Sequence, residues 1–171
     1  MSAGPRRVLV AGIGNVFLGD DGFGVEVAHR IDPATLPDGV DVVDYGIRGV
    51  HLAYELLDAR YDTLLLVDAL PVEGPPGTLA VLDASDEDWG GLAAEHGVPP
   101  MDGHGMDPRS VLALLHGLGG GVERVLVVGC RPAVTDEVMG LSPPVEAALG
   151  DAVRLVTEVA ADEASREAAD A

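Results

Sequence analysis

Three side chains of this sequence could together coordinate a metal ion, although they come from distant segments. Asp21 lies in a glycine-rich turn after the first apolar run, and Asp68 ends the third such run. His104 stands between two glycines shortly before a predicted helix start, whose positive end favours a neutral imidazole. Carboxylate oxygens and an imidazole nitrogen suit nickel or zinc and leave positions open for water or substrate. We therefore predict a metal site formed by Asp21, Asp68 and His104.

The glycine-rich turn over residues 12–24 also suggests a dinucleotide-binding loop. In such a loop a helix N-terminus faces an anionic phosphate, whereas Asp20 and Asp21 occupy that position here. The turn also lacks the Gly-Lys-Ser/Thr ending of a mononucleotide loop. Nucleotide binding is therefore kept as an alternative to the metal site.

The paired carboxylates of the turn have different expected roles. An acidic residue near a helix start usually caps it, and we assign this role to Asp20. Asp21 is then expected to point toward the sheet edge, although the reverse assignment stays open. Gly22 and Gly24 weaken the first helical turn, which indicates that another group approaches the backbone closely there.

Asp68 follows nearly apolar residues, so its burial requires a partner. It could simply hydrogen-bond the following turn. Alternatively it lies in the crevice outside the carboxyl ends of the strands, where open α/β sheets bind ligands. Asp21 follows the first strand and would border the same edge.

Other chemically capable residues have structural interpretations. Cys130 lies in an apolar run and is expected to be a core residue. His29, His51, His96 and His116 are interpreted as structural or solvated. No Ser or Thr lies in a nucleophile-elbow pattern, so a covalent hydrolase mechanism has no support.

The segments that would position these residues alternate between strand and helix patterns. The apolar runs mostly lack alternation, as expected of strands covered on both faces. This order predicts an α/β fold, a three-layer αβα sandwich around a mostly parallel five-stranded sheet. The predicted strands are 7–13, 40–45, 63–70, 78–84 and 124–130, and the predicted helices are 21–31, 50–57, 107–117 and one that begins at Ser142 and Pro143.

Three further segments depart from this regular alternation. The link 71–77 is too short for a helical crossover, so the fourth strand should run antiparallel. Residues 85–106 resemble a long functional or mobile loop. We expect one domain over residues 1–160 and a disordered tail over residues 161–171.

The chain is strongly acidic, with 10 Lys plus Arg against 29 Asp plus Glu and a formal net charge of −19. Such a field repels phosphate backbones and anionic headgroups, so we expect neither nucleic acid nor a membrane as partner. The single Cys, together with no apolar run of membrane-spanning length, favours a cytoplasmic protein.

The glycine-rich turn, together with several later segments, resembles the hydrogenase maturation proteases. Their hallmark is an N-terminal strand followed by Gly-x-Gly-Asn and then Gly-Asp-Asp/Glu-x-x-Gly. This chain carries these patterns at residues 12–15 and 19–24. The similarity extends from residue 7 to about residue 160, and it includes segments 44–49, 66–69, 76–78 and 140–143 and the loop around His104.

The resemblance implies an αβα sandwich with three metal-binding positions, which carry over to Asp21, Asp68 and His104. The first position is Glu in some members, and the shorter Asp here would draw the helix start nearer the ion. The family's Asp-x-Gly-x-x-Gly segment, implicated in substrate recognition, lies here at Asp44, Gly46 and Gly49. A simple strand-end turn is the alternative interpretation of that segment.

The activity that the resemblance implies is endoproteolysis. Such an enzyme removes the C-terminal extension of a nickel-iron hydrogenase large-subunit precursor after nickel insertion. The nickel would arrive with the substrate, and the free enzyme could bind another divalent cation at the same site. A monomer is expected. The alternatives are a non-catalytic large-subunit or metal chaperone of the same fold, and a nucleotide-binding α/β regulator.

Overall fold

The strands form one five-stranded sheet in the order β2-β1-β3-β5-β4. The computed structural model of the chain describes residues 6–58, 61–85, 113, 117 and 122–166. The predicted strands are confirmed to within one residue at each end, and the fourth is antiparallel as expected. The parallel strands are β1 (Val8–Ile13), β2 (Val40–Gly46), β3 (Thr63–Ala69) and β5 (Arg124–Cys130), and the antiparallel strand is β4 (Leu79–Asp83).

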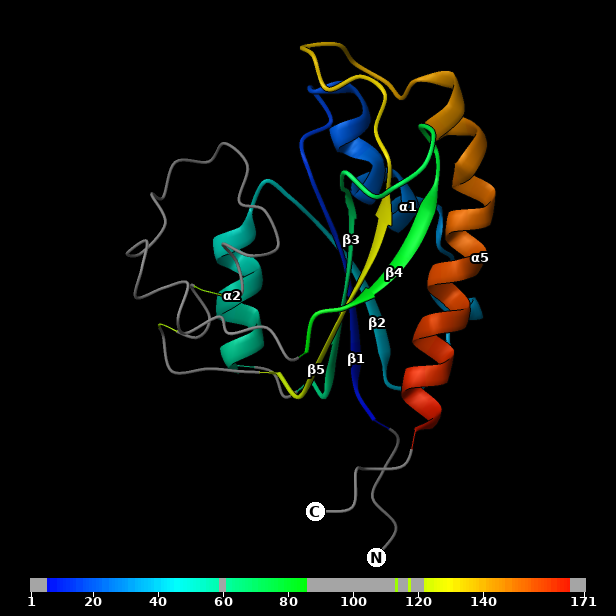
Figure 1. Cartoon of the computed structure of the whole chain (residues 1–171). Coiled ribbons are helices and arrows are strands. Elements are labelled where there is room, and N and C mark those ends of the chain that lie inside the picture. Colours follow the sequence, from blue (N-terminus) through cyan, green and yellow to red (C-terminus); the bar gives the residue numbers. More distant parts are fainter. Residues whose placement is uncertain (1–5, 59–60, 86–112, 114–116, 118–121, 167–171) are drawn as a thin grey trace, which may run out of the picture.

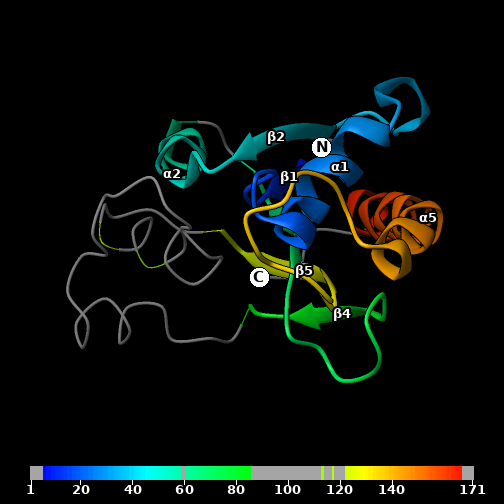
Figure 2. The same cartoon turned by 90° about the horizontal axis from the view of Figure 1, so that it is seen from above.

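Helices cover both faces of the sheet, as Figures 1 and 2 show. Two of them, α1 and α5, pack on one face, and α2 packs on the other. The predicted three-layer αβα sandwich is therefore confirmed. The helical elements are η1 (Gly19–Gly22), α1 (Phe23–Arg30), η2 (Pro33–Thr35), α2 (Gly49–Asp58) and α5 (Pro143–Ser165).

The central strands β1, β3 and β5 are mostly apolar because both of their faces are buried. In β1, Val8 and Val10 join the cluster that contains α1 and α5 residues, whereas Leu9 and Ala11 join the cluster that contains α2 residues. All four are 0% exposed. Alternate side chains of a strand point to opposite faces, so each of these central strands contributes to two cores.

Helix α5 is longer than the sequence predicts. It continues to Ser165, so the expected disordered tail does not begin at residue 161. The reason is a buried ion pair near the helix end: Glu163 is 4% exposed and accepts hydrogen bonds from Arg124 Nε at 2.8 Å and Nη2 at 3.1 Å. Thr63 Oγ1 also donates to it at 3.1 Å. This Ala- and charge-rich segment therefore stays helical where the Glu163 carboxylate binds Arg124 and Thr63.

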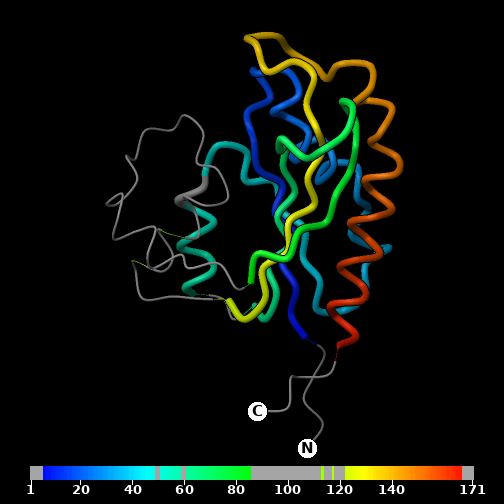
Figure 3. The backbone as a smooth tube through the Cα atoms, in the orientation of Figure 1, coloured from blue at the N-terminus to red at the C-terminus, as the bar shows by residue number. Residues whose placement is uncertain are grey.

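Several expectations fall on residues outside the described part of the chain. These are the irregular loop after residue 85, most of the predicted helix 107–117, and residues 167–171 of the tail. Of the predicted helix, only Ala113 and Gly117 are described, and both are helical. The path of the backbone through the described elements can be followed in Figure 3.

Candidate active site

The carboxyl ends of the parallel strands meet at one edge of the sheet, and β1 lies between β2 and β3 there. The connection after β1 leads to β2 on one side, whereas the connection after β3 leads to β4 and β5 on the other side, and such a reversal opens a crevice in α/β sheets. In the register, Gly12 of β1 pairs with Asp44 of β2 on one side and with Val67 of β3 on the other. Asp44 and Asp68 therefore flank the end of β1.

Asp21 and Asp68 come together around Gly14. A Cβ atom at Gly14 would lie 1.9 Å from the main-chain oxygen of Asp21 and 3.6 Å from Asp68 Oδ1. Gly14 also has a φ of +134°, a conformation that residues with a side chain rarely adopt. The sequence analysis therefore placed these two acidic residues correctly at a shared sheet edge.

Local hydrogen bonds orient both carboxylates. Asp21 Oδ2 accepts a bond from the Asn15 N–H at 2.8 Å, which closes the turn after β1. Asp68 is 6% exposed, and its Oδ1 accepts a bond from the Ala69 N–H at 2.8 Å. Asp68 therefore bonds the residue that follows it, as one of the two sequence interpretations expected, and it is also buried.

The third predicted ligand, His104, lies outside the described residues. Within the described ranges, no three His, Cys, Asp or Glu side chains gather closely enough to hold a metal ion. The structure therefore places the main chain of Asp21 and the carboxylate of Asp68 next to Gly14, and the metal-binding trio stays a prediction.

Asp20 does not cap the helix that follows it, so that expectation is wrong. The N-cap positions of η1 and α1 have no side-chain hydrogen bond. Asp20 is instead 0% exposed and binds a distant segment, which we call the β5–α5 loop (residues 131–142). It accepts bonds from the Ala133 N–H and Val134 N–H at 2.8 Å each, and from Ser142 N at 2.7 Å and Oγ at 2.8 Å.

We call these four hydrogen bonds of the Asp20 carboxylate the clamp. They fix the turn that carries Asp21 against the start of α5, because Ser142 is the N-cap residue of that helix. Burial raises the pKa of Asp20, but the hydrogen bonds from Val134, Ser142 and Ala133 outweigh burial and hold the pKa below its ordinary value. Asp20 is therefore a charged structural residue beneath the site.

The glycines of the turn allow close backbone packing, as the sequence indicated. A Cβ at Gly24 would lie 2.0 Å from the Val67 oxygen and 2.5 Å from the Ile13 oxygen. The approaching group is thus the protein itself, at the ends of β3 and β1. The need for glycine here arises from helix-to-sheet packing and gives no support to a bound phosphate.

The predicted recognition segment lies beside this turn. The Gly14 N–H donates to the Gly46 oxygen at 3.0 Å, and Gly46 has a φ of +54°. Asp44 Oδ2 is 2.6 Å from His29 Nε2, while Asp44 Oδ1 is buried with no hydrogen-bond partner among the described residues. Gly49 begins α2. The strand-end turn therefore exists, and a role of Asp44, Gly46 and Gly49 in recognition stays a prediction.

The sequence analysis missed the contact of His29, which it interpreted as structural or solvated. His29 lies in the last turn of α1, and its ring is 60% exposed while it pairs with Asp44. No local pattern links two residues that are 15 positions apart on a helix and a strand.

Cys130 cannot act as a ready nucleophile. It is 0% exposed, and burial together with the charge of Asp20 raises the pKa of its thiol to about 11. The thiolate is the reactive form, so this cysteine is a core residue, as its sequence context predicts. None of the helices within the described ranges has the length and apolar character needed to cross a membrane.

Comparisons with known proteins agree with this fold. The family model described as hydrogenase maturation protease matches residues 25–159. The hydrogenase 2 maturation protease of Escherichia coli is 31% identical over 152 residues, which cover 88% of each chain.

Solved structures give the same result. The crystal structure of a hydrogenase 2 maturation peptidase from a Thaumarchaeota archaeon is 36% identical, with a TM-score of 0.65 and coverage of 90% of this chain and 97% of that one. The hydrogenase maturating endopeptidase HybD from Escherichia coli has a TM-score of 0.65 and 29% identity, covering 90% and 91%. This chain belongs to the hydrogenase maturation protease family.

Proposed function

We propose that this protein is an endopeptidase that removes the C-terminal extension of a nickel-iron hydrogenase large-subunit precursor after nickel has been inserted. Within a chain of this family, the observation that carries the proposal is the meeting of Asp21 and Asp68 around Gly14 at the carboxyl edge of the sheet. In an open α/β sheet this edge is where substrates bind.

The donor set fits a nickel ion that belongs to the substrate. Two carboxylates beside one crevice repel each other, and a divalent cation offsets that repulsion. Asp21 and Asp68 would supply oxygen ligands and His104 a nitrogen ligand, a set that suits a borderline ion. The free enzyme could bind another divalent cation at the same position.

In this proposal the chain's own residues bind and orient the precursor. Asp21 and Asp68 are held by short bonds to Asn15 and Ala69, so they meet the substrate in a fixed arrangement. The nickel ion of the substrate would polarise the scissile carbonyl or activate a water. Asp44, Gly46 and Gly49 would contact the precursor chain next to the metal. Release of the peptide would let the subunit's C-terminus close over its metal site.

The test is incubation of the purified protein with its cognate precursor, nickel-loaded or nickel-free, followed by mass spectrometry of the C-terminus. We expect a short peptide to be lost from the nickel-loaded precursor only. The variants Asp68→Asn and His104→Ala should abolish the reaction. Asp151→Asn changes an exposed residue of α5 and serves as a matched control that should cleave normally.

A precursor that binds but is never shortened would refute the protease assignment and favour a chaperone of the same fold. Cleavage that does not depend on nickel would refute the recognition of nickel. Normal cleavage by Asp68→Asn would remove that residue from the site.

A further inference from the structure

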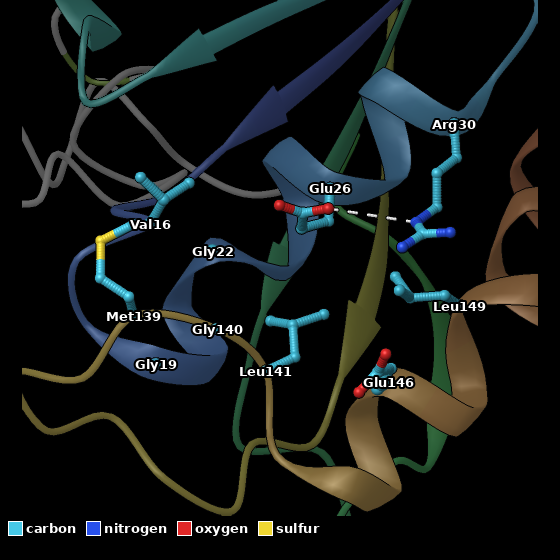
Figure 4. Close-up of a pocket in the computed structure, with 10 residues that line it drawn as sticks. All are labelled: Val16, Gly19, Gly22, Glu26, Arg30, Met139, Gly140, Leu141, Glu146 and Leu149. Atoms are coloured by element: carbon cyan, nitrogen blue, oxygen red, sulfur yellow. Dashed lines mark ion pairs between the residues drawn. The ribbon is translucent and has the colours of Figure 1, made fainter.

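A pocket of about 450 Å³ lies beside the site and has no part in the proposed chemistry. It is bounded by η1, α1, the end of the β5–α5 loop and the start of α5 (Figure 4). Val16 and Met139 lie next to each other at one end, Leu149 lies at the other end, and Leu141 lies between them. The pocket therefore has apolar side chains beside charged ones, and its size accepts a side chain of another molecule.

Exposed apolar residues continue from this pocket along the turn after β1 and along the β5–α5 loop. Phe17 is 64% exposed, Met139 67%, Val138 51% and Val134 37%. We call these four residues the apolar rim. Phe17 follows β1 and the other three follow β5, so the rim stands at the same carboxyl edge as Asp21 and Asp68. A set of exposed apolar side chains of this kind marks a protein interaction surface.

The rim is held in place despite its exposure. The Gly19 N–H donates to the Val138 oxygen and the Asp20 N–H to the Val134 oxygen, both at 2.7 Å. The Asp20 carboxylate adds its bonds to the Ala133 and Val134 N–H groups. These loops would therefore lose little conformational entropy when a partner binds, which favours affinity.

Charge around the pocket indicates which partner fits. Glu26 and Glu146 line the pocket, and Asp136 and Glu137 are exposed on the β5–α5 loop. Among the described residues that line the pocket, the only cation is Arg30, whose Nε lies 4.0 Å from a carboxylate oxygen of Glu26. No described residue forms an ion pair with Glu146. These four carboxylates outnumber Arg30 and Arg131, the cations of the lining and of the β5–α5 loop, and leave this surface negative in a chain whose formal charge is −19.

We propose that the pocket and the apolar rim form a docking surface for a segment of the precursor that carries an apolar side chain next to Lys or Arg. The apolar side chain would enter the pocket between Met139 and Leu149, and the basic group would meet Glu146. The surface extends along two loops beyond the pocket, which favours a polypeptide over a small molecule. This inference rests on the proposed function and names the part of the enzyme that would bind the precursor away from the nickel.

The test measures the dissociation constant for the nickel-loaded precursor in the Asp68→Asn background, so that no peptide is released during the measurement. The variants are Met139→Glu and Glu146→Lys. The matched controls are Leu82→Glu, which changes an apolar residue of β4 with 45% exposure, and Glu158→Lys, which changes an exposed residue of α5. Glu158 is twelve residues from Glu146, roughly 18 Å along the helix.

We expect each pocket variant to weaken binding about tenfold or more, and each control to stay within about twofold. Higher salt should weaken binding of the background protein more than that of Glu146→Lys. Circular dichroism and urea midpoints identify any variant that fails to fold, and Phe17→Ser, at a 64% exposed rim residue, then replaces it.

Unchanged affinity in folded pocket variants, while the background protein binds, would overturn the docking surface and leave the proposed function intact. If wild-type protein neither binds nor cleaves its precursor, the proposed function fails and the docking surface falls with it.

Discussion

The clamp formed by Asp20 allows a quantitative test of how the site is supported. Oδ2 accepts bonds from Ala133 N–H, Val134 N–H and Ser142 Oγ, and Oδ1 accepts one from Ser142 N–H. The substitution Asp20→Asn keeps the size of the side chain but leaves one acceptor oxygen and adds an NH2 group. In the better orientation, that NH2 faces the Ser142 N–H, so two donors oppose each other.

The expected cost follows from these contacts. Hydrogen bonds to a charged acceptor contribute about 1.5–3 kcal/mol and those to a neutral acceptor about 0.5–1.5 kcal/mol. One bond is lost and three are weakened, while the carboxylate no longer has to be buried. We therefore expect Asp20→Asn to lower the free energy of unfolding by about 3 kcal/mol. For a chain of this size that lowers Tm by roughly 6–12 °C.

Urea denaturation as a function of pH gives a second measure of the same clamp. The pKa of Asp20 is lowered in the folded state, so its contribution is present above the unfolded pKa and is lost as pH falls through the folded pKa. Asn does not titrate. The difference between wild type and Asp20→Asn should therefore be constant above about pH 5 and shrink below about pH 4.

The control is Asp151→Asn, since Asp151 is 69% exposed and pairs only with Arg154 among the described residues. It should change the free energy of unfolding by less than about 0.5 kcal/mol. The reasoning is refuted if Asp20→Asn unfolds within that same margin of wild type at pH 7, or if its full deficit persists at pH 3.

Three further predictions concern packing and burial. Gly24→Ala places a Cβ 2.0 Å from the Val67 oxygen and should lower the free energy of unfolding by about 3 kcal/mol or more. Gly150→Ala, in α5, places a Cβ 3.9 Å from Arg154 Nη1 and should raise the free energy of unfolding by about 0.5–1 kcal/mol, so equal urea midpoints of the two variants would contradict both expectations. Glu163→Gln weakens a buried ion pair and should cost about 2–4 kcal/mol by urea denaturation, and a cost below about 0.5 kcal/mol would refute its role in ordering the end of α5. Cys130 should react with iodoacetamide at pH 8 at least about tenfold more slowly in folded than in urea-unfolded protein, and equal rates would show that its burial is incomplete.

Much of the fold follows from local sequence patterns. Short apolar runs without alternation are typical of strands covered on both faces, which predicts a parallel sheet between helical layers. The seven-residue link before β4 cannot contain a crossover helix, and that length alone predicted its antiparallel direction. Asp21 and Asp68 could be placed at one edge for a related reason, since parallel strands all end on the same side.

The contacts that stabilise the site could not be predicted in this way. Asp20 meets residues 113 to 122 positions further along the chain, and Glu163 meets Thr63 across 100 positions. His29 meets Asp44 only because α1 packs next to β2. A carboxylate beside a helix start has the same local signal whether it caps that helix or binds a distant loop.

The sequence by itself therefore determined the strands, the layers and the edge at which Asp21 and Asp68 lie, because each depends on burial and chain direction over a few neighbouring residues. Only the tertiary structure decided that Asp20 holds the start of α5 and that the rim and the pocket form beside it. These features depend on how segments over 100 residues apart cross in space, and hydrogen bonds between such segments leave no pattern in either segment alone.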